Sequence, residues 1–206
     1  MRRAEEHQMT PTSLPDLPDV PDLPEAPAWS IRTEQPLDLD QIHELHRDAF
    51  RGPAEAELVD AVRSGAGFIP GLSLVAATDD GSVLGHILLS QVGFDPSGTD
   101  PIRQDVLALA PLSVLPPHQG RGIGSALMRH ALALADAREE PFTVVLGSPA
   151  FYGQFGFVAA GGHGVDGPYD AAGEAFQVRP RPGTDGIPAG TVVYPRMFGS
   201  VSIRSR

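Results

Sequence analysis

The spacing of apolar residues along the chain predicts an α/β domain built around a strand, a helix and a second strand. Residues 105–115 are apolar at most positions, which is typical of a strand covered on both faces. Apolar residues then recur at spacings of three and four and so share one side of a helix: Ile123, Leu127, Ala131, Leu134 and Ala135. Residues 142–146 predict the next strand.

Upstream of this unit, the pattern predicts a strand, two helices and a hairpin of strands. Residues 29–33 predict the first strand, Asp38 suits a helix cap and Pro53 suits the start of a second helix. The inward sides of these helices are predicted to consist of Leu39, Ile42, Leu45, Ala49 and Phe50, then of Leu58, Ala61 and Val62. Residues 72–77 and 83–90 flank Asp79-Asp80-Gly81-Ser82, a hairpin signal, and residues 94–103 are predicted to be a loop.

The two ends of the chain differ from this central part. Residues 1–28 contain a repeated unit of an acidic residue, an apolar residue and proline, which favours the extended polyproline II conformation. We expect this segment to be a disordered tail. The alternative is a segment that docks on a partner protein. Residues 29–206 are predicted to form one domain. Within it, residues 175–178 and 191–194 predict two strands around a loop, and hence a C-terminal hairpin extension over residues 161–206.

Composition narrows the function classes. The chain has 206 residues and no cysteine, which excludes disulfides, thiolate metal sites and a thiol nucleophile. Its formal net charge of -11 argues against nucleic acid as a partner and is compatible with a cationic substrate such as an amine, or with solubility alone. No apolar run reaches the roughly 18 residues of a membrane helix, and no signal peptide is apparent, so we expect a cytoplasmic protein without a membrane partner.

The segment Gln119-Gly120-Arg121-Gly122-Ile123-Gly124 joins the predicted central strand to the predicted helix. The first N–H groups of a helix lack intrahelical partners and carry partial positive charge, and glycines let a phosphate approach them closely. Since Arg121 adds a cation, the segment predicts an anion-binding turn. Ser125 follows the third glycine without the lysine of a nucleoside triphosphate loop, and the glycine spacing differs from the dinucleotide fingerprint.

Two motifs, about one βα unit apart, resemble those of a known family. The turn of residues 119–124 resembles motif A of the GNAT N-acetyltransferase superfamily, which binds the pyrophosphate of acetyl-coenzyme A (acetyl-CoA). Downstream, Tyr152-Gly153-Gln154-Phe155-Gly156-Phe157 resembles the family's Tyr-x-x-x-Gly-Phe segment. The segments that lead into the two motifs are most similar to the bacterial YhbS-like branch, and the resemblance covers roughly residues 30 to 160.

The resemblance implies an α/β fold with a mixed, mostly antiparallel central sheet, helices on both faces and a splayed central strand pair. Pro111 cannot donate to a strand ladder, but it fits the bulge at which the family's fourth strand leaves the fifth. The pantetheine arm of the coenzyme would then bond to backbone groups of residues 112–114; the alternative is an ordinary bulge without a ligand. The C-terminal hairpin would wall the acceptor site.

The resemblance also implies an enzyme that moves an acetyl group from acetyl-CoA to a primary amine, of a small molecule or a protein, by direct transfer in a ternary complex. Acetyl-CoA would be the cosubstrate, no metal would take part, and a homodimer is a family expectation. The alternative is a non-catalytic acyl-CoA-binding sensor or regulatory module. The expected coenzyme contacts are Leu112, Ser113, Val114, His118, Gln119, Gly120, Arg121, Gly122, Ile123, Gly124, Ser125, Ser148, Tyr152 and Phe155.

Acetyl transfer requires a polarised carbonyl, a proton donor for the leaving thiolate and a base for the amine. The resemblance implies the N–H of Leu112 or Ser113 for the first role and the Tyr152 phenol for the second. The base is left open, because residues 107–115 contain no carboxylate. The candidates are Glu55 and Glu57 acting through water, His86, and Ser148 holding a water or the pantetheine.

One further segment raises the question of a metal site. His43-Glu44-Leu45-His46 brings two histidines together on a predicted helix. Its spacing is not the His-Glu-x-x-His of zinc proteases. We therefore predict an exposed helix face at this segment rather than a metal site.

Overall fold

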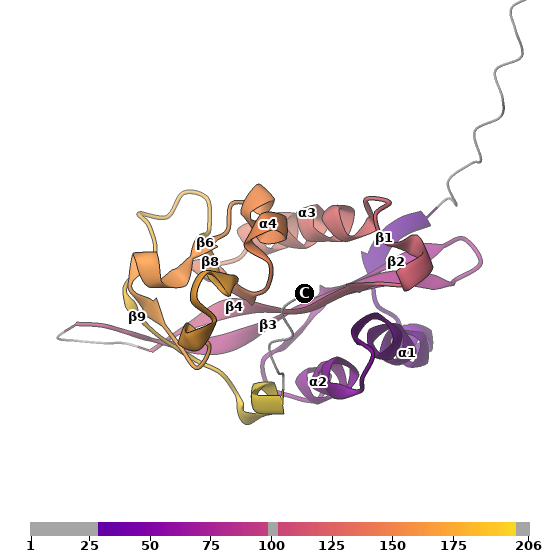
Figure 1. Cartoon of the computed structure of the whole chain (residues 1–206), viewed down its shortest axis with the longest axis horizontal. Helices are drawn as coiled ribbons and strands as arrows, with labels where there is room; N and C mark the ends of the chain where they lie inside the picture. Colours follow the sequence, from indigo (N-terminus) through magenta and orange to yellow (C-terminus); the bar gives the residue numbers. More distant parts are fainter. Residues whose placement is uncertain (1–28, 99–102, 201–206) are drawn as a thin grey trace, which may run out of the picture.

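The structure, a computed structural model, describes residues 29–98 and 103–200. The predicted N-terminal tail lies outside the described residues. Helices α1 (Leu39–Phe50) and α2 (Ala54–Arg63) cover one face of a twisted sheet, and α3 (Ile123–Asp136) and α4 (Pro149–Tyr152) cover the other (Figure 1). Within the described ranges, no helix has both the length and the apolar character needed to cross a membrane.

The described part of the chain forms nine strands and several short 3-10 helices. The strands are β1 (Trp29–Thr33), β2 (Phe68–Thr78), β3 (Val83–Pro96), β4 (Gln104–Val114), β5 (Phe142–Leu146), β6 (Val158–Ala159), β7 (Val165–Asp166), β8 (Phe176–Pro180) and β9 (Gly190–Val193). The 3-10 helices are η1 (Pro36–Asp38), η2 (Pro116–His118), η3 (Gly153–Phe155), η4 (Ala160–His163), η5 (Asp170–Ala175) and η6 (Arg196–Ser200).

The strand order confirms the predicted mixed, mostly antiparallel sheet. It is β1-β2-β3-β4-β5-β8-β6, with β9 paired to β3 and β7. Two neighbouring pairs are parallel, β4 with β5 and β7 with β9, and the others are antiparallel. The predicted strands and helices upstream of residue 90 are present, and both motifs of the resemblance follow strands at the centre of the sheet.

Two predictions about the N-terminal half need correction. The Asp38 carboxylate does not cap α1; it accepts hydrogen bonds from Arg32 (2.9 Å) and from the N–H of Gln35 (2.7 Å) instead. The loop predicted from Phe94 is wrong at its start, because β3 continues to Pro96. Phe94 is fully buried there, and its ring packs edge-on against Phe142 with centroids 5.0 Å apart.

The predicted C-terminal hairpin is also wrong, although both of its strands exist. β8 pairs with β5 and β6, whereas β9 pairs with β3 and β7. Each strand pairs with a different strand edge. β8 pairs with β5, and β9 pairs with the part of β3 beyond Ser90, which is not paired with β2. Unpaired backbone N–H and C=O groups at such edges need hydrogen-bond partners. Pairing with these distant edges is therefore favoured over pairing of β8 with β9 across the loop.

Each face of the sheet carries its own apolar core. The α1 and α2 side is closed by Leu45, Leu58 and Val62 against strand residues such as Val75 and Leu88. On the other side, α3 buries six side chains: Ile123, Leu127, Met128, Ala131, Leu132 and Ala135. Leu134, predicted to face inward, is 38% exposed, because the buried side of α3 is centred closer to Met128 and Leu132.

Candidate active site

β4 and β5 separate in the middle of the sheet and leave a wedge between them. Their last paired residues are Leu109 and Val145, while β4 stays paired to β3 as far as Val114. Between Leu109 and Leu112 two residues of β4 lie opposite one residue of β3, so the bulge predicted at Pro111 is confirmed. The edge of β4 that faced β5 is therefore unpaired beyond Leu109.

The backbone groups that face this wedge follow from the pairing of β4 with β3. The N–H of Leu115 donates to the carbonyl of Leu84 (2.9 Å). Because N–H and C=O groups alternate sides along a strand, the N–H of Ser113 also points toward β3, and those of Leu112 and Val114 point into the wedge. Consistently, the Val114 carbonyl accepts a hydrogen bond from Gln119 Nε2 (2.9 Å) on that side.

The predicted anion-binding turn lies at the mouth of the wedge. Gly120 and Gly122 have φ values of +73° and +85°, which favour glycine, and both positions border open space. Gly122 occupies the N-cap position of α3 and has no side chain with which to satisfy the first N–H groups. At Gly124, a Cβ would lie 3.6 Å from Val114 and 4.0 Å from Phe151, so α3 begins against both walls of the wedge.

Tyr152 forms the wall opposite β4. It ends α4, which follows β5, and its ring covers Gly147 so closely that a Cβ at Gly147 would clash. The ring also packs edge-on against Phe151 and Phe157, with centroids 5.0 Å and 5.8 Å away. Burial raises the pKa of Tyr152 to about 12, so its phenol is protonated at neutral pH.

The remaining predicted contacts lie around the same opening. His118 is half-buried at the end of η2, and within the described residues its Nδ1 has no hydrogen-bond partner. Arg121 and Ser148 are exposed, and Phe155 is half-buried with Arg129 over its ring. The Ser148 side chain does not cap α4, although its carbonyl accepts from the N–H groups of Phe151 and Tyr152 (3.0 Å each).

A buried chain of polar side chains begins at Ser113 and runs along the α1 and α2 face of the sheet to the surface. Ser113 Oγ lies 2.9 Å from His46 Nδ1, and His46 Nε2 lies 2.8 Å from His86 Nδ1. His86 Nε2 lies 2.9 Å from Ser73 Oγ, which donates to Glu34 (2.6 Å). Arg63 closes the chain with two hydrogen bonds to Glu34, of 2.8 Å and 2.9 Å. We call these six residues the polar chain.

The two histidines of the polar chain are neutral, and its carboxylate is ionised. Burial lowers the pKa of His46 well below its ordinary value, and the neighbouring His86 adds to the effect. Burial also lowers the pKa of His86, although Glu34 opposes this in part. Burial alone would raise the pKa of Glu34, but hydrogen bonds from His86, Arg63 and Ser73 hold it far below its usual range.

The exposed helix face predicted at His43 and His46 is therefore wrong for His46, which has no exposed surface. The sequence did contain a signal, since His46 lies on the same helical stripe as Ile42 and Leu45. His43 does lie at the surface, where Nδ1 contacts Asp60 (2.8 Å). Among the described residues, no group of three or more His, Asp or Glu side chains is arranged to hold a metal ion.

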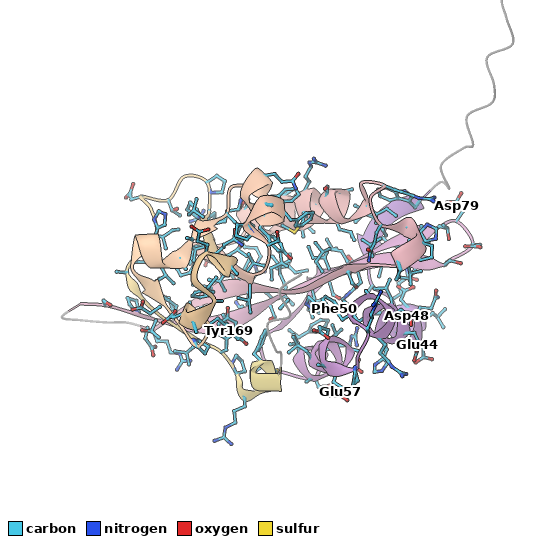
Figure 2. The ribbon with its side chains drawn as sticks, viewed as in Figure 1. Glu44, Asp48, Phe50, Glu57, Asp79 and Tyr169 are labelled. Atoms are coloured by element: carbon cyan, nitrogen blue, oxygen red, sulfur yellow. The ribbon has the colours of Figure 1, made fainter. Side chains whose placement is uncertain are left out.

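Of the candidate bases left open by the sequence, only His86 belongs to the polar chain. Glu55 is half-exposed and Glu57 is exposed on α2. Figure 2 shows Glu57 on the side of α2 that faces away from the sheet. The sequence did not point to Glu34 or Ser73, because Glu34 follows β1, Ser73 lies within β2 and neither belongs to a local motif.

Comparison with known proteins defines the family. Residues 39–157, more than half of the chain, match the Acetyltransferase (GNAT) family. The chain belongs to this family of acetyltransferases. A curated Escherichia coli K12 relative, the uncharacterized N-acetyltransferase YhbS, is 36% identical over 148 residues, which are 72% of this chain and 84% of the relative.

Solved structures agree with this placement. The crystal structure of Escherichia coli YhbS in complex with CoA has a TM-score of 0.73 and 30% identity, and the match covers 86% of this chain and 95% of that one. A GNAT acetyltransferase from Brucella melitensis in complex with acetyl-CoA has a TM-score of 0.66 and 32% identity, covering 84% and 99% of the two chains. The predicted similarity to the YhbS-like branch is confirmed.

Proposed function

We propose that the protein transfers the acetyl group of acetyl-CoA to a primary amine by direct attack in a ternary complex. The observation that carries this function is the open wedge between β4 and β5, with the glycine turn of α3 at its mouth. Its support comes from family membership and from relatives whose crystal structures contain CoA or acetyl-CoA. The acceptor is an amine of a small molecule or of a protein.

The wedge and the turn fit the two polar parts of the coenzyme. The pyrophosphate would accept hydrogen bonds from the N–H groups at the start of α3, where open space adjoins Gly120 and Gly122. The pantetheine arm would lie along the unpaired edge of β4 and bond to Leu112 and Val114. Arg121 is an exposed residue of the turn and would add a cation to the phosphates.

Two groups on opposite walls of the wedge would act on the thioester. The N–H of Leu112 points into the wedge, where it would stabilise the negative charge that develops on the carbonyl oxygen as the amine attacks. The neutral Tyr152 phenol would donate its proton to the thiolate as the carbon–sulfur bond breaks. The amine must lose one proton in the same reaction, which requires a base.

Two measurements test this function. The first is a calorimetric titration of the protein with acetyl-CoA and with CoA. The second is a thiol-release assay with four amines: spermidine, lysine, an aminoglycoside and a peptide with a free N-terminus. We expect binding of both forms of the coenzyme, and thiol release that depends on one of the amines. Binding without release on any amine, a peptide included, would favour the sensor or regulatory module. Absence of binding would overturn the proposal.

A further inference from the structure

We propose that Ser113, His46 and His86 form a proton relay that takes the proton from the acceptor amine. This inference rests on the proposed acetyl transfer, and it supplies the base that the sequence of β4 lacks. Ser113 would be the member that contacts the amine, and the two histidines would act through it. The relay would end at His86, beside the Glu34 carboxylate.

The placement of Ser113 connects the polar chain to the wedge. Ser113 lies between Leu112 and Val114, whose backbone groups point into the wedge at the edge of β4. Its own side chain points out of the sheet toward α1, where it contacts His46. Ser113 is 5% exposed, whereas His46 and His86 have no exposed surface. A proton from the acceptor site would therefore enter the polar chain at Ser113.

All hydrogen bonds from Ser113 to Glu34 donate in the same direction, toward the Glu34 carboxylate. The donors can be assigned one after another, starting from Glu34. The ionised carboxylate accepts from Ser73, so the Ser73 oxygen accepts from His86 Nε2–H. A neutral His86 then has an acceptor at Nδ1, which fixes the proton of His46 on Nε2. His46 Nδ1 is left as an acceptor, so the Ser113 hydroxyl donates to it. The Ser113 oxygen keeps lone pairs for an incoming proton.

This direction defines a balanced proton transfer. As the amine nitrogen bonds to the carbonyl carbon, its proton passes to Ser113 Oγ, and the former hydroxyl proton passes to His46 Nδ1. The Nε2 proton of His46 passes to His86 Nδ1. Ser113 is again a hydroxyl, His46 is again neutral, and His86 is an imidazolium next to Glu34. The reverse transfers to water, after the amide has left, restore the starting state.

The apolar residues around the polar chain indicate that it has a role beyond packing. Val75, Leu88 and Val92 occupy the same face of the sheet, and burying two imidazoles among such residues costs free energy unless every polar atom is paired. An apolar side chain at each position would avoid that cost. The groups that act on the two histidines come from several elements: Glu34 and Asp38 favour the protonated form, whereas Arg63 and His43 disfavour it.

Nitrogen-15 NMR of the imidazoles tests the direction of the relay in the free protein, without any acceptor. We expect both His46 and His86 to be neutral near pH 7, each with its proton on Nε2. Ser113→Ala should shift the Nδ1 resonance of His46, because it removes the hydroxyl that donates to that nitrogen. A proton on His46 Nδ1 in the wild type would reverse the chain and overturn the relay.

Kinetics test whether the relay takes part in turnover. With the amine that gives the fastest thiol release, Ser113→Ala should lower kcat about 100-fold with little change in the affinity for acetyl-CoA, and Ser113→Thr should restore most of the loss. Ser90→Ala is the matched control, because Ser90 is also a buried serine on this face of the sheet, 1% exposed, and its hydroxyl has no partner among the described residues. Equal kcat values for Ser113→Ala and Ser90→Ala would refute the relay.

The pH profile separates a relay from a structural role. In the wild type, kcat should fall on the acid side below the ordinary histidine pKa of about 6.5, as the histidine pair becomes protonated. His86→Gln preserves a donor and an acceptor but cannot take up the proton, so this acid limb should disappear. A wild type that neither binds acetyl-CoA nor releases thiol would defeat the proposed function instead, while the NMR result would still decide the hydrogen-bond direction.

Discussion

The two faces of the central strands differ in what they contribute to the site. On the α3 side near the wedge, the described side chains of strands β2, β3 and β4 are apolar and include Leu74, Ile87 and Leu109. Toward α1 and α2, the adjacent residues Ser73 and His86 are polar and buried, and Ser113 follows on β4. One face supports the backbone groups proposed for the coenzyme, and the other carries the side chains proposed for proton transfer.

The two faces should therefore respond to different kinds of substitution. A site made of backbone N–H groups is insensitive to the loss of single side chains, but it is sensitive to added bulk and negative charge close to those groups. A site made of buried side chains is sensitive to the loss of one donor or acceptor, because each partner is left unsatisfied. Substitutions on the two faces should therefore separate coenzyme affinity from turnover.

The largest expected effect is on the backbone site. Gly122→Asp places a carboxylate at φ +85°, directly before the first turn of α3, where the phosphates would lie. Asp is among the residues that tolerate this backbone region, so the fold should persist. Repulsion and lost hydrogen bonds should weaken acetyl-CoA binding about 1,000-fold in a calorimetric titration.

Gly183→Asp is the matched control for this change. Gly183 has φ +83° and also borders open space, but it lies in the loop after β8, beyond the end of β5 that is opposite to the wedge. The control carries the same strain and the same charge, and its coenzyme affinity should equal that of the wild type. Undiminished binding by Gly122→Asp, or equal losses in both variants, would contradict the phosphate site.

The second prediction concerns the proton donor at the opposite wall of the wedge. Tyr152→Phe keeps the ring that covers Gly147 and removes only the hydroxyl. We expect kcat for thiol release to fall about 100-fold with coenzyme affinity retained. Because burial raises the pKa of Tyr152 to about 12, its ionisation should not limit the wild-type rate below about pH 10. Unchanged kcat in the variant would remove the proton-donor role.

The sequence predicted the structural features proposed for coenzyme binding better than those proposed for proton transfer. The glycine turn, the bulge at Pro111 and the Tyr152 segment are each local in sequence, so pattern and resemblance were sufficient to find them. The polar chain is assembled from separate elements, and its members become neighbours only when the sheet and α1 pack together. For the same reason the pairing of β8 and β9 was not predicted, since it depends on distant strand edges.

A partial signal for the polar chain was nevertheless present. His86 is the only polar side chain between Val83 and Leu89, and a lone histidine in an apolar strand needs a buried partner. His46 lies on the apolar stripe of α1. Apolar neighbours therefore favoured burial of both histidines, although we predicted an exposed face at His46. No sequence pattern indicated that the two histidines are in contact.

The third prediction tests the buried histidines through stability. Since burial lowers their pKa values, the unfolded state binds more protons below about pH 6.5, and each histidine should reduce the free energy of unfolding by up to about 1.4 kcal/mol per pH unit as the pH falls. Glu34, whose pKa is lowered, should contribute to the acid loss only below about pH 4.5. Urea unfolding at several values between about pH 7.5 and pH 5 measures the slope.

His86→Gln provides the comparison for this slope. Gln does not titrate, so the variant should be less dependent on pH over the same range, whatever its stability at neutral pH. Identical slopes for the variant and the wild type would show that the polar chain does not hold His86 neutral.

The smallest expected effect is that of the one cation in the glycine turn. Arg121 is exposed, so its attraction to the coenzyme phosphates is screened by water and salt, in contrast to the fixed N–H groups of α3. Arg121→Ala should weaken acetyl-CoA binding about 5-fold at low ionic strength and by less than about 2-fold in 0.5 M salt. Arg47→Ala, which removes an exposed arginine from α1 on the opposite face, should change neither value. If Arg121→Ala still weakens acetyl-CoA binding in high salt, Arg121 forms part of a desolvated phosphate site. It would then not be a mobile cation next to a phosphate site made of backbone N–H groups.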